Sequence, residues 1–126
     1  MVQTDISQLT GECNQWREHL RTCREEFNLL KNQLQHAVNK QLSKDQLTNL
    51  EHYQNQLHIQ LINIHDIKQA VKAHDRKINF ESTETTGQIA DETYADHEKL
   101  FEEYQSLKSS LEDLRGEFGN FITGLQ

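Results

Sequence analysis

The sequence predicts an all-α fold, an elongated antiparallel up-down-up three-helix bundle with heptad (coiled-coil-like) packing. Apolar side chains recur three and four residues apart over almost the whole chain, which is the spacing of a stripe along one side of a helix. The 126 residues contain no proline, so no helix is interrupted in that way. A capping box at Ser43 and one polar break at residues 81–87 divide the pattern into three. We therefore expect one domain over residues 1–126, with helices at about 4–41, 44–80 and 88–123.

The first helix is expected to begin at Thr4 or Thr10, because either side chain can cap a helix, and to run to about Lys40. Its apolar stripe alternates three- and four-residue steps without a miss. The stripe consists of Ile6, Leu9, Cys13, Trp16, Leu20, Cys23, Phe27, Leu30, Leu34 and Ala37.

A second helix follows almost at once. Ser43 and Gln46 form a capping box ahead of Leu47, so the link is short and the second helix must run antiparallel to the first. We expect this helix to end near Phe80. Its stripe consists of Leu47, Leu50, Tyr53, Leu57, Leu61, Ile64, Ile67, Val71, His74 and Ile78.

Residues 81–87 read Glu-Ser-Thr-Glu-Thr-Thr-Gly and lack periodicity, so they are expected to form a loop. Thr85 and Gln88 offer a second capping box, and Asp91 and Glu92 suit the first turn of a third helix. Its stripe consists of Ala90, Thr93, His97, Leu100, Tyr104, Leu107, Leu111, Leu114, Phe118, Phe121 and Leu125.

Composition indicates a cytoplasmic protein. Apolar residues make up 34% of the chain and never run far enough to span a bilayer, and the first residues do not read as a secretory signal. Cys13 and Cys23 lie ten residues apart, about 15 Å along a helix, too far to bridge within it. We expect two buried thiols in a reducing compartment; the alternative is a cross-chain disulfide in a parallel homodimer.

Charge is divided unevenly along the chain. Residues 1–42 carry five positive and five negative charges, residues 43–80 five and four, and residues 81–126 three and eleven. The basic cluster at the end of the second helix suits the helix dipole, and we expect neither nucleic acid nor membrane as a partner. The acidic third helix is either a solvated face or a docking surface for a basic partner. Its candidate contact residues are Glu98, Glu102, Glu103, Glu112, Asp113 and Glu117.

Two branched aliphatic residues, Ile59 and Ile62, lie off the main stripe of the second helix. A bundle that needed only its three stripes would not require them. Their positions fit either ordinary surface variation and a wider core, or a face for self-association or for a partner helix. We take them as the first candidates for an interaction face.

The sequence shows no catalytic, cofactor or metal signature, although it contains seven histidines. Helical di-iron sites need a glutamate three residues before a histidine, and no histidine here has a carboxylate in that position. His19 and Cys23 are the one pair of soft ligands four residues apart, but Cys23 belongs to the stripe. His74 and His97 occupy stripe positions, where a core histidine is the usual meaning.

His65, Asp66, Ile67 and Lys68 resemble the phosphorylated segment of histidine phosphotransfer domains, which are helical bundles of similar length. In that family the histidine is followed by an apolar residue and a lysine, and then usually by a small residue, whereas this chain has Gln69. The resemblance covers four residues and implies a phosphorelay carrier with His65 as the phosphoacceptor.

We expect a non-catalytic bundle that binds another protein or itself, with a homodimer as one form. The alternatives are a phosphorelay carrier that uses His65 and a bundle that binds a metal or a small ligand. The sequence assigns no catalytic residue, cofactor or metal ligand to any of these.

Overall fold

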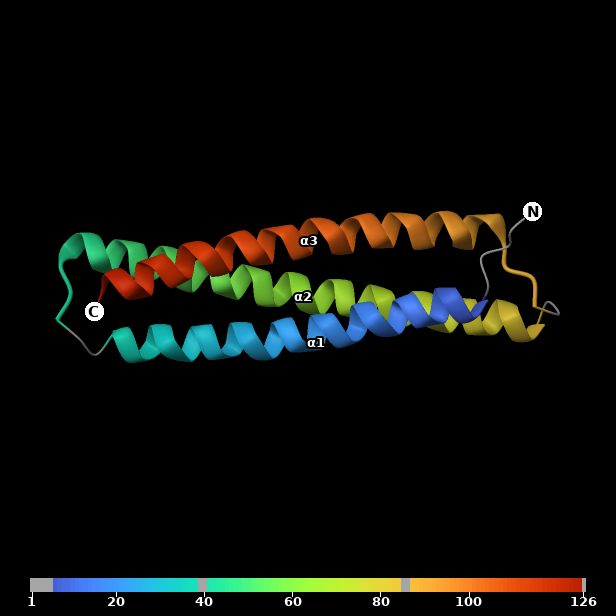
Figure 1. Cartoon of the computed structure of the whole chain (residues 1–126), viewed down its shortest axis with the longest axis horizontal. Coiled ribbons are helices and arrows are strands. Elements are labelled where there is room, and N and C mark those ends of the chain that lie inside the picture. Colours follow the sequence, from blue (N-terminus) through green and yellow to red (C-terminus); the bar gives the residue numbers. More distant parts are fainter. Residues whose placement is uncertain (1–5, 39–40, 85–86, 126) are drawn as a thin grey trace.

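The structure is a computed structural model that describes residues 6–38, 41–84 and 87–125. Three helices account for nearly all of them: α1 spans Ile6–Ala37, α2 spans Lys44–Glu84 and α3 spans Asp91–Gly124. They lie lengthwise beside one another, and each reverses the direction of the one before it (Figure 1). The all-α three-helix bundle predicted from the sequence is confirmed.

The start of α2 forms as predicted. The backbone N–H of Ser43 donates to Oε1 of Gln46 at 2.9 Å, and the backbone N–H of Gln46 donates to Oγ of Ser43 at 3.1 Å. These reciprocal bonds satisfy two backbone donors that would otherwise lack partners at a helix start. The capping box therefore fixes the tight reversal between α1 and α2.

The prediction for the start of α1 was wrong at Thr10. Its hydroxyl lies inside the helix and donates to the backbone carbonyl of Ile6 at 3.0 Å, so it does not cap the first turn. Thr4, the other candidate, lies outside the described residues, as does Lys40 at the predicted end. The helix ends at Ala37, a few residues earlier than expected.

The predicted loop at residues 81–87 is helical over its first four residues, because α2 continues to Glu84 instead of ending near Phe80. No residue between Phe80 and Glu84 breaks a helix, and Gly87, beyond the end of α2, has φ of 87°, the left-handed conformation that glycine adopts easily. Its N–H donates to the carbonyl of Ser82 at 3.0 Å. Thr85 of the second predicted capping box lies outside the described residues.

The start of α3 is held by Glu81, which the sequence analysis had placed in the loop. Its Oε1 accepts from the backbone N–H of Ala90 at 2.9 Å, and its Oε2 accepts from the hydroxyl of Thr93 at 2.6 Å. A carboxylate at this end of a helix also complements the helix dipole. The last turn of α2 therefore positions the first turn of α3, which begins at Asp91 and not at residue 88.

Every buried side chain of the described residues belongs to one of the three predicted stripes. The reverse does not hold, since Leu47 leads the second stripe but is 45% exposed. Three polar side chains accompany the apolar core: His74, Thr93 and His97. Within the described part of the chain, no helix is both long and apolar enough to cross a bilayer. The two buried histidines set one level of the core apart from the rest.

Candidate metal centre

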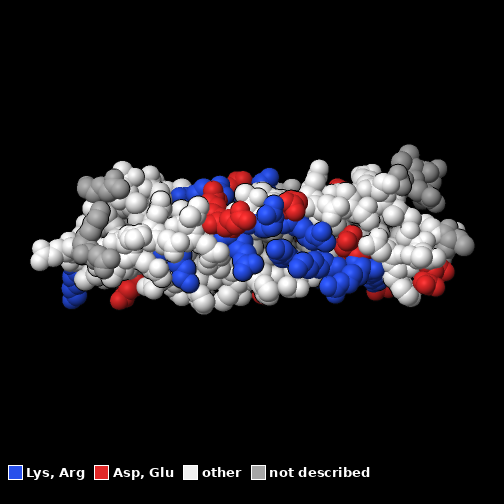
Figure 2. Space-filling model, turned by 90° about the horizontal axis from the view of Figure 1, so that it is seen from below, with Lys and Arg blue, Asp and Glu red and all other residues white. Residues whose placement is uncertain are grey.

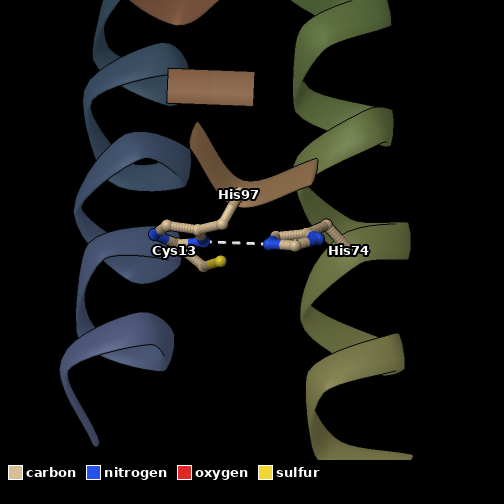
Figure 3. A group of neighbouring side chains, drawn as sticks. All are labelled: Cys13, His74 and His97. Atoms are coloured by element: carbon tan, nitrogen blue, oxygen red, sulfur yellow. Dashed lines mark hydrogen bonds between the residues drawn. The ribbon is translucent and has the colours of Figure 1, made fainter. Parts of the chain in front are cut away.

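Cys13 of α1, His74 of α2 and His97 of α3 meet in the core, each contributed by a different helix (Figure 3). Their side chains are 0%, 7% and 5% exposed. One sulfur or nitrogen atom from each lies within 4.8 Å of the other two. The described residues contain one such group of three potential metal ligands, and it is this one.

A chain of hydrogen bonds assigns the tautomers of the two rings in the form in which both are neutral. Nε2 of His97 lies 3.1 Å from Oε1 of Glu12, and a carboxylate only accepts, so Nε2 carries the proton. Nδ1 of neutral His97 then has a lone pair, and it lies 2.8 Å from Nε2 of His74, which donates to it. Nδ1 of His97 therefore faces Nε2 of His74, with the Cys13 side chain beside the pair (Figure 3).

Neighbouring groups hold His97 in this orientation. The Trp16 ring packs on its imidazole with ring centroids 4.8 Å apart, and the Trp16 side chain is itself only 4% exposed. Glu12 supplies the carboxylate on the far nitrogen. Metal-binding histidines usually have such an outer partner, because it fixes the ring and strengthens the lone pair that binds the ion.

Burial governs the electrostatics of the group. It raises the pKa of the Cys13 thiol to about 12, with a smaller contribution from the carboxylate of Asp75. Burial, followed by repulsion from His97, lowers the pKa of His74 below its usual value. The thiol and the His74 ring are thus held neutral near pH 7, and neutral imidazole is the form that binds a metal.

The three side chains suit an ion that prefers nitrogen and sulfur. Zn²⁺ binds imidazole nitrogen at about 2.0 Å and thiolate sulfur at about 2.3 Å, which places neighbouring ligand atoms roughly 3.5 Å apart. The observed separations, from 2.8 Å between the two nitrogens to no more than 4.8 Å, bracket that value. Small side-chain rotations would bring all three atoms onto one ion.

Cys23, the other buried cysteine of α1, has different neighbours from Cys13 at its own level along the bundle. Its Sγ lies 3.6 Å from Nε2 of His19, and Nδ1 of His19 lies 2.6 Å from the hydroxyl of Tyr104 on α3. Only one imidazole is present, and both soft ligands come from α1. His19 and Cys23, the pair found by sequence spacing, are therefore in contact, but they lack the additional ligands that surround Cys13.

The other predicted residues lie on the surface. Ile59 and Ile62 are 39% and 47% exposed on α2, and His65 is exposed nearby. None of the three contributes to the buried group. All six candidate acidic residues of α3 are exposed: Glu98, Glu102, Glu103, Glu112, Asp113 and Glu117.

The sequence analysis did not find the Cys13 group because it searched for ligands within one helix. The relevant signal was available in the register of the bundle. Cys13 lies 30 residues before Ser43 and His74 lies 31 residues after it, so an antiparallel turn at Ser43 places them at one level. The second link returns α3 along α2, which places His97 beside His74. Searches of protein-family models, curated proteins and solved structures gave no match to this chain.

Proposed function

We propose that this protein is a non-catalytic helical bundle that binds one Zn²⁺ ion between its three helices. The observation that carries the proposal is the meeting of Cys13, His74 and His97 in the core, with ligand atoms within 4.8 Å of one another. The ion would bind Sγ of Cys13, Nε2 of His74 and Nδ1 of His97. Structural zinc sites usually have four protein ligands, whereas this group offers three, so water or another group would take the fourth position.

Proton balance for this binding is simple. The Cys13 thiol releases its proton to solvent as the sulfur–zinc bond forms. His74 keeps one proton, which moves from Nε2 to Nδ1 so that the Nε2 lone pair can bind. His97 keeps its proton on Nε2, where Glu12 accepts it. One proton is released for each ion bound.

The choice of Zn²⁺ over Cu⁺ follows from the ligands. Two of the three are imidazoles, which are borderline ligands, and only one is a soft thiolate. The Glu12 carboxylate on His97 adds negative charge that offsets the second positive charge of Zn²⁺. Because the Cys13 thiol must stay reduced to bind the ion, we also propose a cytoplasmic location.

Cobalt titration tests the proposal, because Co²⁺ substitutes for Zn²⁺ and its thiolate complexes absorb light. We expect one equivalent of Co²⁺ to give a thiolate charge-transfer band that Zn²⁺ abolishes. Cys13→Ala should remove the band and Cys23→Ala, the matched control on the same helix, should keep it. A wild-type protein without the band, or equal bands in both variants, would refute the proposal. Displacement of Co²⁺ by Cu⁺ but not by Zn²⁺ would reassign the ion.

Self-association is a second candidate function, and the exposure of Ile59 and Ile62 on α2 favours it. The occupant we propose is a second copy of the chain, because the charges of the bundle complement one another. Figure 2 shows Lys and Arg side chains gathered along the middle of one face, and Arg17, Arg21 and Lys68 lie in the α1–α2 part of the surface. The exposed acidic residues of α3 could face them in a second copy.

Sedimentation across a range of concentrations tests this second candidate. We expect wild type to associate and the double variant Ile59→Asp with Ile62→Asp to remain monomeric. Leu29→Asp is the control for adding an acid at an exposed aliphatic position, because Leu29 is 64% exposed and lies on a different helix, α1. A monomeric wild type, or equal loss of association in the control, would refute the proposal.

A further inference from the structure

A groove of about 290 Å³ lies between α2 and α3 beside the candidate metal centre. Ala70, Ala73 and Leu100 line it, together with charged side chains from both helices. His74 also lines the groove, so this residue belongs both to the groove and to the buried group. Neither Cys13 nor His97 lines it.

We propose that this groove is the route by which Zn²⁺ enters and leaves the centre, with His74 as the first ligand that an incoming ion meets. The inference rests on the proposed zinc site and adds the path and the order of ligand exchange. Cys13 is 0% exposed, so an ion cannot reach its sulfur directly from solvent. His74, at 7% exposure and within the groove lining, connects the solvent to the core.

Small side chains keep this route open. Ala70 lies four residues before His74, on the same side of α2, and Ala73 is its neighbour in the chain. Both alanines are exposed, so a larger side chain at either position would extend into the groove without displacing the core. The width of the groove beside His74 thus depends on two residues that contribute little to packing.

An ion pair spans the groove next to the ligands. Nζ of Lys77 on α2 lies 3.2 Å from Oδ2 of Asp96 on α3, three residues after His74 and one residue before His97. Their side chains are 42% and 47% exposed, so water competes for both charges and the pair can open readily. We infer that it must part, or shift, each time an ion passes.

A second approach to the centre leads past Glu12, whose side chain is 36% exposed and contacts His97. That side leads to Nε2 of His97, which carries a proton and does not face the other two ligands. An ion arriving there would meet no lone pair that belongs to the site. The groove is therefore the better route.

Stopped-flow measurement of Co²⁺ uptake and of chelator-driven release tests the route in the full chain. Ala73→Phe should slow both processes by about tenfold or more while the equilibrium affinity stays within about twofold, because a blocked path raises one barrier in both directions. Ala70→Phe should act in the same way. Ala95→Phe is the matched control, since Ala95 is exposed on α3 and does not line the groove.

Unchanged rates in both groove variants would overturn the route, as would equal slowing in Ala95→Phe. Slowing by Glu12→Phe but not by Ala73→Phe would move the route to the Glu12 side. A wild type that binds no Co²⁺ at equilibrium would instead refute the proposed zinc site. The two failures are thus distinguishable.

Discussion

The two cysteines of α1 lie in the same stripe and are almost equally buried, at 0% and 2% exposure, yet their surroundings differ. At the level of Cys13, α2 and α3 each contribute a histidine with a nitrogen within 4.8 Å of the sulfur. At the Cys23 level, the histidine comes from α1 itself and α3 contributes the hydroxyl of Tyr104. Burial alone therefore does not make a cysteine a candidate ligand; the residues that the neighbouring helices place at its level do.

The two cysteines share the same electrostatic effect of burial but differ in what can offset it. Burial raises the pKa of both thiols, so neither is a reactive thiolate near pH 7. Binding a metal ion requires such a thiol to lose its proton, which is unfavourable in the core. The ion can offset that cost only where further ligands also bind it. Cys23 and its neighbours therefore serve as a control for the proposed metal site at Cys13.

The largest expected effect on metal binding comes from replacing the α3 residue beside each cysteine, His97 beside Cys13 and Tyr104 beside Cys23, by the other type. His97→Tyr removes one of three ligands, so we expect the Zn²⁺ affinity to fall by more than about 100-fold, beyond the loss typical of an outer partner. Tyr104→His gives the Cys23 level a second imidazole, and we expect a second, weaker Co²⁺ equivalent. Titration against a chromophoric chelator measures both. An unchanged stoichiometry in Tyr104→His would mean that the α3 residue does not separate the levels.

Zinc should stabilise the fold through the Cys13 level alone. At a free Zn²⁺ concentration 100 times the dissociation constant, we expect the free energy of unfolding to rise by about 2.7 kcal/mol. For a chain of this length that corresponds to a rise in melting temperature of roughly 10 °C. Cys23→Ala should keep the full increment and Cys13→Ala should lose it, as followed by circular dichroism. Equal increments in the two variants would contradict the assignment.

Glu12 should matter less than a ligand but more than a comparable glutamate elsewhere. Glu12→Gln leaves an acceptor for Nε2 of His97 without the charge, and we expect the affinity for Zn²⁺ to fall about tenfold. Glu26→Gln is the control, because Glu26 instead accepts from Nε of Arg115 at 2.7 Å. Isothermal titration gives both affinities. A loss as large in Glu26→Gln would indicate a general effect of surface charge.

The smallest expected effect is on the loss of stability at acidic pH, to which His19 beside Cys23 contributes. Burial lowers the pKa of His19, helped by Lys108 and Arg115 on α3 and opposed by Glu112 and Glu26. The unfolded chain then binds more protons than the folded chain below about pH 6.5, so the stability present above that pH is lost as the pH falls. His19→Gln should reduce this loss, as measured by urea unfolding at pH 7 and pH 5. The difference should be small, because His19 is half-exposed.

Much of the fold could be predicted from the sequence, because the information is local and repeated. The stripes identify the inward faces, and the Ser43–Gln46 box marks the first reversal. The second reversal was harder to predict. It is held by a hydrogen bond from the N–H of Ala90 to Glu81, nine residues earlier, and no capping rule uses that spacing. The polar segment 81–87 was taken for a loop, although its first four residues continue the helix.

The candidate centre could not be found by the same means. Its ligands are single residues on three helices, and each has an ordinary meaning where it stands: a small core residue at Cys13, and core histidines at His74 and His97. Their chemistry appears only when the three helices are aligned at one level. Sequence patterns within a helix cannot report this, since the alignment depends on two link lengths.

The origin of the ligands also determines when the centre can exist. Cys13 and His97 are separated by 84 residues, with two chain reversals between them. A paired α1 and α2 alone would offer one thiol and one imidazole, so the proposed ion would be held firmly only after α3 has docked. During synthesis, α3 emerges last. Zinc capture would therefore be a late folding event, and its rate would report the docking of the final helix.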